Sequence, residues 1–139
     1  MAHVVKEVQN EELDSLYRTP KYTMVEKKHY ETVVQGMREA VLNGTCHAAD
    51  LPGIEVCGKT GTAQNRGKDH SAFMGFAPMT DPKIAVAVYV ENGGFGAVYG
   101  VPIGALIMEQ YLTGTLSEES EKKAKTIQQR VIYYGNQER

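Results

Sequence analysis

The chain has 139 residues, with 15 Lys and Arg against 17 Asp and Glu and a formal net charge of −2. Such a balance creates no basic field, which argues against a nucleic-acid partner. No apolar run reaches the roughly 18 residues of a membrane-spanning helix, so we expect no membrane contact by this chain. The length is that of one domain, and we expect residues 1–139 to form a single unit.

The first predicted element is a helix at about residues 26–43, in which apolar side chains recur every three to four positions. The sequence Asn43-Gly44-Thr45 that follows is formally a glycosylation site. A glycine directly after an amphipathic run commonly adopts the left-handed conformation that ends a helix. We therefore interpret Gly44 as the cap of this helix rather than as part of a modification site.

Three strands are predicted next, at about 54–63, 71–77 and 83–91. A polar connection separates the first two, and a proline-containing turn separates the second from the third. Because Ile84–Val90 is apolar at every position, we expect both faces of the third strand to be covered.

Two helices close the chain. The first, at about 101–113, is apolar over almost its whole circumference, so we expect it to be buried, and Gly114 ends it. A capping sequence at Thr115–Glu118 begins a charged helix at about 117–130. Strands joined by short turns between helices predict an α+β fold, in which a three-stranded antiparallel meander packs on helices.

The most informative motif is Gly58-Lys59-Thr60-Gly61-Thr62, because two unrelated chemistries use it. Together with Gly53 it completes a formal Walker A pattern, which would make the chain a nucleotide-binding module. A phosphate loop must open a helix directly after its lysine, whereas residues 60–69 are rich in Gly, Thr, Asn and Asp, which form helices poorly. The second chemistry is that of serine acyl-transferases, which carry Lys-Thr-Gly in the active site.

As part of a strand, the motif would form the wall of an acyl-transfer site. Lys59 would supply a positive charge for an anionic substrate terminus. Thr60 and Thr62 would share one face, because strand side chains alternate. Gly61 would let another chain approach the backbone closely, and backbone N–H groups at such a place can donate to an oxyanion.

The resemblance to a known family extends well beyond this motif. Five stretches, in family order, resemble class B penicillin-binding proteins, and most of all the elongation-type penicillin-binding protein 2: Tyr30–Gly44, Gly53–Gln64, Asp69–Pro78, Ile84–Gly94 and Val101–Gly114. Ala72 stands where many relatives carry a large aromatic residue. The resemblance implies that residues 1–139 are a C-terminal part of a serine D,D-transpeptidase domain, with a partial serine transpeptidase/β-lactamase-like fold.

In that family a serine attacks the penultimate D-Ala carbonyl, and an acceptor amine resolves the acyl-enzyme. The resemblance implies that Lys59, Thr60 and Thr62, with Gly61 between them, hold the terminal carboxylate of a D-Ala-D-Ala stem peptide or of a β-lactam. The resemblance also implies catalytic roles for Lys59 and Thr62. In this family the Thr62 N–H would help to form the oxyanion hole. The resemblance further implies a role in cell-wall synthesis and cell shape, and a parent protein anchored in the bacterial inner membrane with this domain on the periplasmic side.

The family's nucleophile motifs, Ser-x-x-Lys and Ser-x-Asn, do not precede the Lys-Thr-Gly element. The only formal Ser-x-x-Lys begins at Ser120, in a charged segment that we interpret as a solvated helix surface. We therefore expect the parent protein to be an enzyme but this chain alone to be inactive. A serine β-lactamase relative, which shares the Lys-Thr-Gly strand, and a non-catalytic interaction domain remain as alternatives.

The remaining chemistry-bearing residues predict no cofactor and no metal site. Cys46 and Cys57 lack the spacing of metal ligands and are interpreted as buried free thiols, and the four His are scattered singly. The strand at 83–91 should have a free edge in this chain. Because free apolar edges recruit other strands, we expect that two copies can pair as a homodimer.

Overall fold

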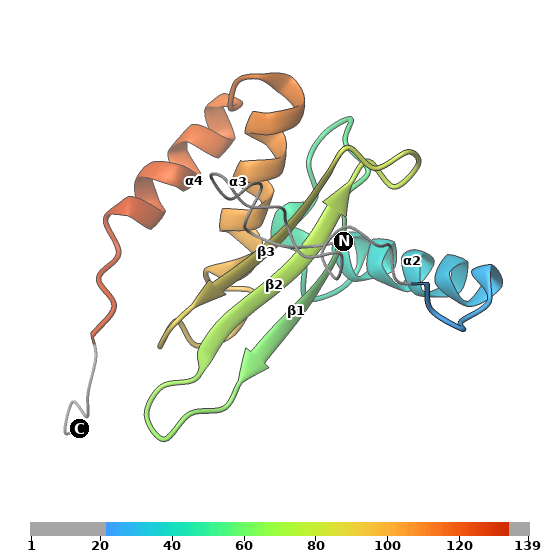
Figure 1. Ribbon diagram of the computed structural model, residues 1–139. Helices are drawn as coiled ribbons and strands as arrows, with labels where there is room; N and C mark the ends of the chain where they lie inside the picture. Colours follow the sequence, from blue (N-terminus) through green and yellow to red (C-terminus); the bar gives the residue numbers. More distant parts are fainter. Residues whose placement is uncertain (1–21, 134–139) are drawn as a thin grey trace, which may run out of the picture. The chain divides into compact units, whose positions relative to one another are not determined.

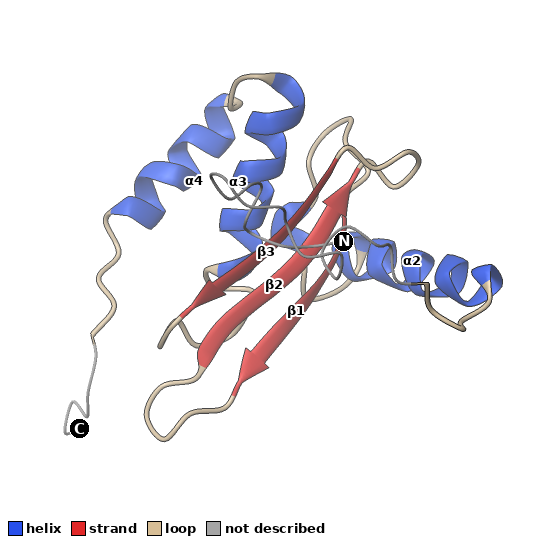
Figure 2. Cartoon of the chain, viewed as in Figure 1, coloured by secondary structure: helices blue, strands red, loops and turns tan. Residues whose placement is uncertain are grey.

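A computed structural model describes residues 22–133 of the chain (Figures 1 and 2). The chain divides into two compact units, Met1–Tyr30 and Glu31–Arg139. In the first unit, the hydroxyls of Thr23 and Tyr30 form a hydrogen bond with each other. The second unit contains the sheet and most of the helical residues.

Helix α2 (Lys27–Leu42) is the first helix among the described residues, and both of its ends lie within one residue of the prediction. Its last turn contributes the fully buried Val41 to the core. Gly44 does not have the left-handed conformation that the cap interpretation requires, since positive φ angles occur at Gly53, Gly94 and Gly114 among the described glycines. A Cβ at Gly44 would lie 2.9 Å from the Cα of Ala40, so close contact rather than φ favours glycine at this place.

The sheet is the predicted antiparallel meander, with strand order β1-β2-β3. Its strands are β1 (Cys57–Ala63), β2 (His70–Ala77) and β3 (Ile84–Val90). The predicted start of the first strand at 54 is wrong by three residues. Leu51 and Ile54 form an isolated bridge that closes a tight turn through Gly53, whose φ is 76°, and the strand begins only after this turn.

Helix α3 (Gly100–Thr113) covers one face of the sheet (Figure 1). The register places Thr60 opposite Phe73 and Phe73 opposite Val88, so side chains of all three strands share this face. The core gathers between the sheet, α3, the last turn of α2 and the short 3-10 helix η1 (His47–Ala49). Its buried members are Val41, Cys46, Ala49, Leu51, Val56, Phe73, Ala77, Val101, Ala105 and Met108.

The opposite face of the sheet is open among the described residues, which contradicts the prediction that both faces of β3 are covered. Ala85, Ala87 and Tyr89 alternate with the half-buried positions of β3 and are exposed. The apolar composition of β3 would suit burial on both faces, but in residues 22–133 helical packing covers only one. The prediction that α3 is buried over its whole circumference is also wrong, because its Ile107 and Tyr111 are exposed.

Helix α4 (Glu118–Gln128) follows α3 across a short turn that begins at Gly114, whose φ of 81° ends α3 as predicted. The N-cap of α4 is Ser117, whose Oγ accepts from the Ser120 N–H at 3.3 Å. The predicted capping sequence therefore lies in the right place, but Ser117 rather than Thr115 carries the cap. No helix within residues 22–133 is both long and apolar enough to span a bilayer.

Candidate functional site

The Lys-Thr-Gly-Thr motif lies inside a strand. Residues 60–63 continue β1 after Lys59, and a polar connection leads from there to β2. A phosphate loop needs a helix N-terminus at this point, because its N–H groups and dipole hold the phosphates. The backbone after Lys59 therefore contradicts the nucleotide-binding alternative.

Lys59 and Thr60 come together at the outer edge of the sheet. Within residues 22–133, β1 pairs with β2 alone, so its other edge is unpaired. The Lys59 side chain is exposed, and its Nζ donates to the carbonyl of the next residue, Thr60, at 3.0 Å and lies 3.5 Å from Thr60 Oγ1. An ammonium group and a hydroxyl thus lie side by side, a combination that suits a carboxylate.

Thr62 and Gly61 continue the same strand without joining this pair directly. Thr62 is exposed and lies opposite Ser71, and no hydrogen bond links its hydroxyl to Lys59 or Thr60 in the described part of the chain. Gly61 lies opposite Ala72, and a Cβ at Gly61 would be 3.4 Å from the Cβ of Ala72. Thr60 and Thr62 share a face by strand alternation, as predicted.

Thr45 is a neighbour of the motif that sequence reasoning did not assign to the site. Its Oγ1 lies 2.8 Å from Thr60 Oγ1, across a separation of 15 residues.

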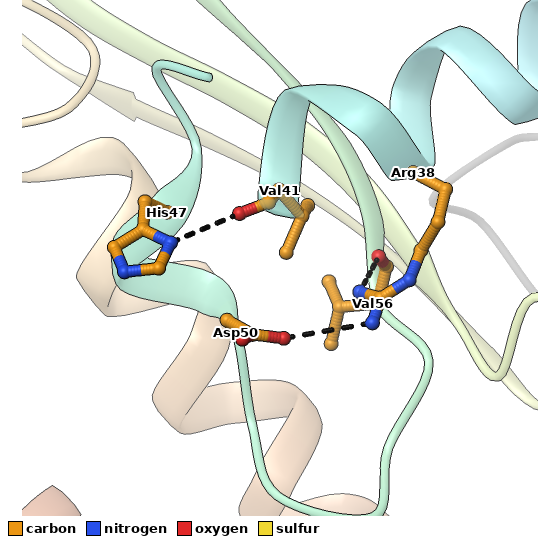
Figure 3. A network of polar contacts seen from close by, with 5 residues as sticks. All are labelled: Arg38, Val41, His47, Asp50 and Val56. Atoms are coloured by element: carbon orange, nitrogen blue, oxygen red, sulfur yellow. Dashed lines mark hydrogen bonds and ion pairs between the residues drawn. The ribbon is translucent and has the colours of Figure 1, made fainter. Parts of the chain in front are cut away.

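The segment that carries Thr45 is held beside β1 by the polar contacts of Figure 3. There Arg38 Nη1 donates to the Val56 carbonyl at 2.9 Å and Nη2 lies 3.5 Å from Asp50 Oδ1. His47 Nδ1 lies 3.3 Å from the Val41 carbonyl oxygen in the same network (Figure 3).

The glycine-rich loop between β3 and α3 lies directly against the motif. A Cβ at Gly96 would come within 2.7 Å of the Gly61 carbonyl oxygen and 2.4 Å of that of Ala72. Ser71, which is fully buried, fixes this loop: its Oγ donates to the Phe95 carbonyl at 2.9 Å and accepts from the Gly100 N–H at 3.0 Å. Ser71 is thus a second residue that positions the surroundings of the motif and that the sequence alone did not reveal.

A shallow hollow of about 300 Å³ lies on the open face of the sheet beside Lys59. Ala72 lines it together with Met74, Ala87 and Tyr89. Met74 and Tyr89 are 61% and 57% exposed, so the hollow is largely apolar and accessible. The small side chain of Ala72, at the position where the resemblance leads one to expect a large aromatic, helps to keep it open.

The two cysteines are buried free thiols, as predicted. Burial raises the pKa of both the Cys46 and the Cys57 thiol above the usual value, so each is held in the protonated form, which is the weaker nucleophile. Among residues 22–133, no three His, Cys, Asp or Glu side chains gather as a metal site.

The formal Ser-x-x-Lys at Ser120 lies in helix α4, remote in the chain from β1. The prediction of a solvated surface is wrong for Ser120 itself, which is only 3% exposed. It packs beside Glu109 of α3, and its hydroxyl helps to stabilise the Glu109 carboxylate. This serine is therefore engaged in joining α3 to α4.

Comparisons with known proteins agree with this arrangement. A family model described as "Penicillin binding protein transpeptidase domain" matches residues 2–110. Peptidoglycan D,D-transpeptidase PbpA of Mycobacterium tuberculosis is 40% identical over an alignment of 75 positions, which covers 46% of this chain and 15% of the relative. The chain therefore corresponds to a small part of that curated relative's length.

Two solved structures show the same likeness in three dimensions. Pseudomonas aeruginosa PBP2 in complex with WCK 5153 matches with a TM-score of 0.59 and 36% identity, over 72% of this chain and 23% of that one. The imipenem acyl-enzyme complex of penicillin-binding protein A from M. tuberculosis matches with a TM-score of 0.51 and 32% identity, over 60% of this chain and 19% of that one. The match across residues 2–110 shows that this chain belongs to the penicillin-binding protein transpeptidase domain family.

Proposed function

We propose that this chain, as the C-terminal part of a peptidoglycan D,D-transpeptidase domain, supplies its substrate-recognition strand and thereby serves cell-wall synthesis and cell shape. The observation that carries the proposal is the meeting of Lys59 Nζ with the Thr60 carbonyl and hydroxyl at the unpaired edge of β1. A peptide that ends in D-Ala-D-Ala presents a carboxylate. Lys59 would attract that group, and the Thr60 hydroxyl would donate to it.

Gly61 and Thr62 complete the proposed substrate-recognition strand. Gly61 has no side chain, so the backbone of a ligand can approach β1 closely there. The Thr62 N–H would donate to the oxyanion that forms when the scissile carbonyl is attacked, and its hydroxyl would assist in binding the carboxylate. We therefore propose Lys59 and Thr62 as catalytic residues, because both would contact the reacting substrate.

The attacking serine and its base would come from another part of the transpeptidase domain. Of the serines among residues 22–133, Ser71 is buried with its hydroxyl in two hydrogen bonds, Ser120 is buried beside Glu109, and Ser117 caps α4. A nucleophile needs a positioned base within hydrogen-bond reach. This chain by itself would bind without reacting.

The proposed ligands are the peptidoglycan stem peptide and β-lactams. Support for β-lactams comes from the likeness to the M. tuberculosis protein that was solved as an imipenem acyl-enzyme. Because peptidoglycan lies outside the cytoplasmic membrane, we place the proposed activity on the periplasmic side, with the parent protein anchored in the inner membrane. A further proposed partner is a second copy, through the edge of β3 that β2 leaves unpaired among the described residues.

A titration followed by NMR tests the recognition role. The uniformly ¹⁵N-labelled chain is titrated with Nα-acetyl-D-Ala-D-Ala and, separately, with its methyl ester. We expect the free acid to shift the amide signals of Lys59–Thr62, and the ester to shift them far less. Lys59→Met should weaken binding of the acid about 10- to 150-fold, because a hydrogen bond to a charged group contributes roughly 1.5–3 kcal/mol.

Lys125→Met is the matched control, since Lys125 is an exposed lysine on α4. It should leave the affinity unchanged. Equal shifts with acid and ester, or equal weakening by both lysine substitutions, would contradict the proposal.

A further inference from the structure

Thr45 lies outside the Lys-Thr-Gly-Thr motif but contacts it through its hydroxyl. Its Oγ1 is 2.8 Å from Thr60 Oγ1, and both side chains are accessible to solvent. The backbone around Thr45 is fixed by its neighbours: the Cys46 N–H donates to the Ala40 carbonyl at 2.9 Å, and Gly44 packs against Ala40. Thr45 therefore approaches Thr60 from a held segment.

The direction of the Thr45–Thr60 hydrogen bond follows from the other groups that surround Thr60. A hydroxyl has one proton to donate and two lone pairs with which to accept. The Lys59 ammonium, 3.5 Å from Thr60 Oγ1, can only donate. A carboxylate can only accept, so a bound carboxylate takes the single proton of Thr60. Thr45 must then donate to Thr60.

We propose that Thr45 is a positioning residue for carboxylate recognition: it donates to Thr60 Oγ1, and so turns the Thr60 proton toward the ligand and strengthens its donation. The proposal rests on the proposed function, and it adds a residue that lies outside the recognised motif. Chained hydrogen bonds polarise one another, so the second bond gains from the first. Thr45 itself does not contact the ligand.

We expect folding to depend little on this hydroxyl. The segment between α2 and β1 is tied down by Arg38, which bonds the Val56 carbonyl and pairs with Asp50. An exposed hydrogen bond between two hydroxyls contributes little to folding, since water replaces either partner. A loss of the Thr45 hydroxyl should therefore appear in ligand binding rather than in thermal stability.

The test compares Thr45→Val, which keeps the shape and removes the hydroxyl, with Thr45→Ser, which keeps the hydroxyl. Each variant of the 139-residue chain is titrated by NMR with Nα-acetyl-D-Ala-D-Ala and with its methyl ester. Thr45→Val should raise the dissociation constant of the acid about two- to tenfold, the size of one neutral hydrogen bond, and leave weak binding of the ester unaltered. Thr45→Ser should restore most of the affinity. Thr80→Val, at an exposed threonine in the turn between β2 and β3, should match the unsubstituted chain.

A second measurement needs no ligand. Three-bond couplings to the Thr60 Cγ2 report its χ1 populations, and Thr45→Val should spread these populations over more than one rotamer. If Lys59→Met weakens acid binding while Thr45→Val changes neither affinity nor couplings, Thr45 has no positioning role and the proposed function stands. If the unsubstituted chain shows no binding that depends on the carboxylate, both proposals are wrong.

Discussion

The ring of Phe73 occupies the space directly beside Gly104: a Cβ at Gly104 would lie 2.5 Å from two carbons of the ring. The same ring blocks a Cβ at Gly58 of β1, also at 2.5 Å, and at Gly75 of β2, at 2.7 Å. One buried aromatic side chain thus requires glycine on two strands and on α3. The recognition strand is held against the helix through this contact.

Gly104→Ala should destabilise the chain, although alanine favours helices over glycine by roughly 1 kcal/mol. The added methyl group would force the buried Phe73 ring to move, and overpacking of this kind costs about 1–3 kcal/mol. Urea unfolding measures the change. Gly36→Ala in α2 is the control, because nothing lies within 4 Å of a Cβ there, and it should stabilise the chain slightly. Equal effects of the two substitutions would rule out the steric explanation.

Ser71→Ala should loosen the loop between β3 and α3. It removes an acceptor for the buried Gly100 N–H and a donor to the Phe95 carbonyl, and an unsatisfied buried group costs about 1–3 kcal/mol. Hydrogen exchange at the Gly100 amide should accelerate about tenfold or more. Ser117→Ala, which removes the cap of α4, should instead accelerate exchange at the Ser120 amide. An unchanged Gly100 amide in the Ser71 variant would contradict this account.

The free energy of unfolding should decrease at acidic pH, and protonation of Glu109 should account for part of this decrease. Burial raises the pKa of this carboxyl group, but the Ser117 N–H, which donates to Oε1 at 3.0 Å, the neighbouring Ser120 hydroxyl and the charge of Lys123 outweigh burial and lower the pKa below the ordinary 4.5. Ionised Glu109 therefore stabilises the folded state above about pH 4.5, and this contribution is lost as the pH falls through the lowered folded-state pKa.

Glu109→Gln cannot ionise, so its free energy of unfolding should vary less with pH than that of the unsubstituted chain below pH 4.5. Urea unfolding at closely spaced pH values measures both curves. Curves that stay parallel down to pH 3 would show that Glu109 does not contribute.

The chain alone should form no covalent adduct with a fluorescent penicillin and should not hydrolyse a chromogenic cephalosporin. Ser71 and Ser120 are buried, and Ser117 is used as a helix cap. Intact-mass spectrometry after incubation with penicillin checks the first point. A stoichiometric adduct mapped to any serine of this chain would overturn it, and turnover of the cephalosporin would favour the β-lactamase alternative.

Light scattering should detect a dimer or a larger assembly at working concentration. In residues 22–133 the outer edge of β3 is unpaired, and Ala85, Ala87 and Tyr89 leave an apolar face beside it. Ala87→Lys places a charge on that face and should shift the equilibrium toward the monomer. A monomer in the unsubstituted chain, with slow amide exchange along Ile84–Val90, would contradict pairing through this edge.

The sequence by itself determined helices α2, α3 and α4, the three strands and their order, but not the short helix η1. Periodicity located α2 and the three strands to within about three residues, because alternation and three-to-four spacing are local properties of the chain. Gly114 marked the end of α3 because its conformation depends on the residue itself. The family was recognisable for the same reason, since Lys59–Thr62 and its flanking segments are contiguous in the sequence.

Only the tertiary structure decided which surfaces are covered and which distant residues meet. The all-apolar sequence of β3 indicated that burial is favourable, but whether a layer lies on each face depends on other segments. Thr45 reaches Thr60 across 15 residues, and Ser71 reaches Phe95 across 24. Neither pair has a sequence signal, because a threonine or serine can bond to water as well as to a neighbour. The fold determines the partner, because it brings the two segments close enough for the hydroxyl to form the bond.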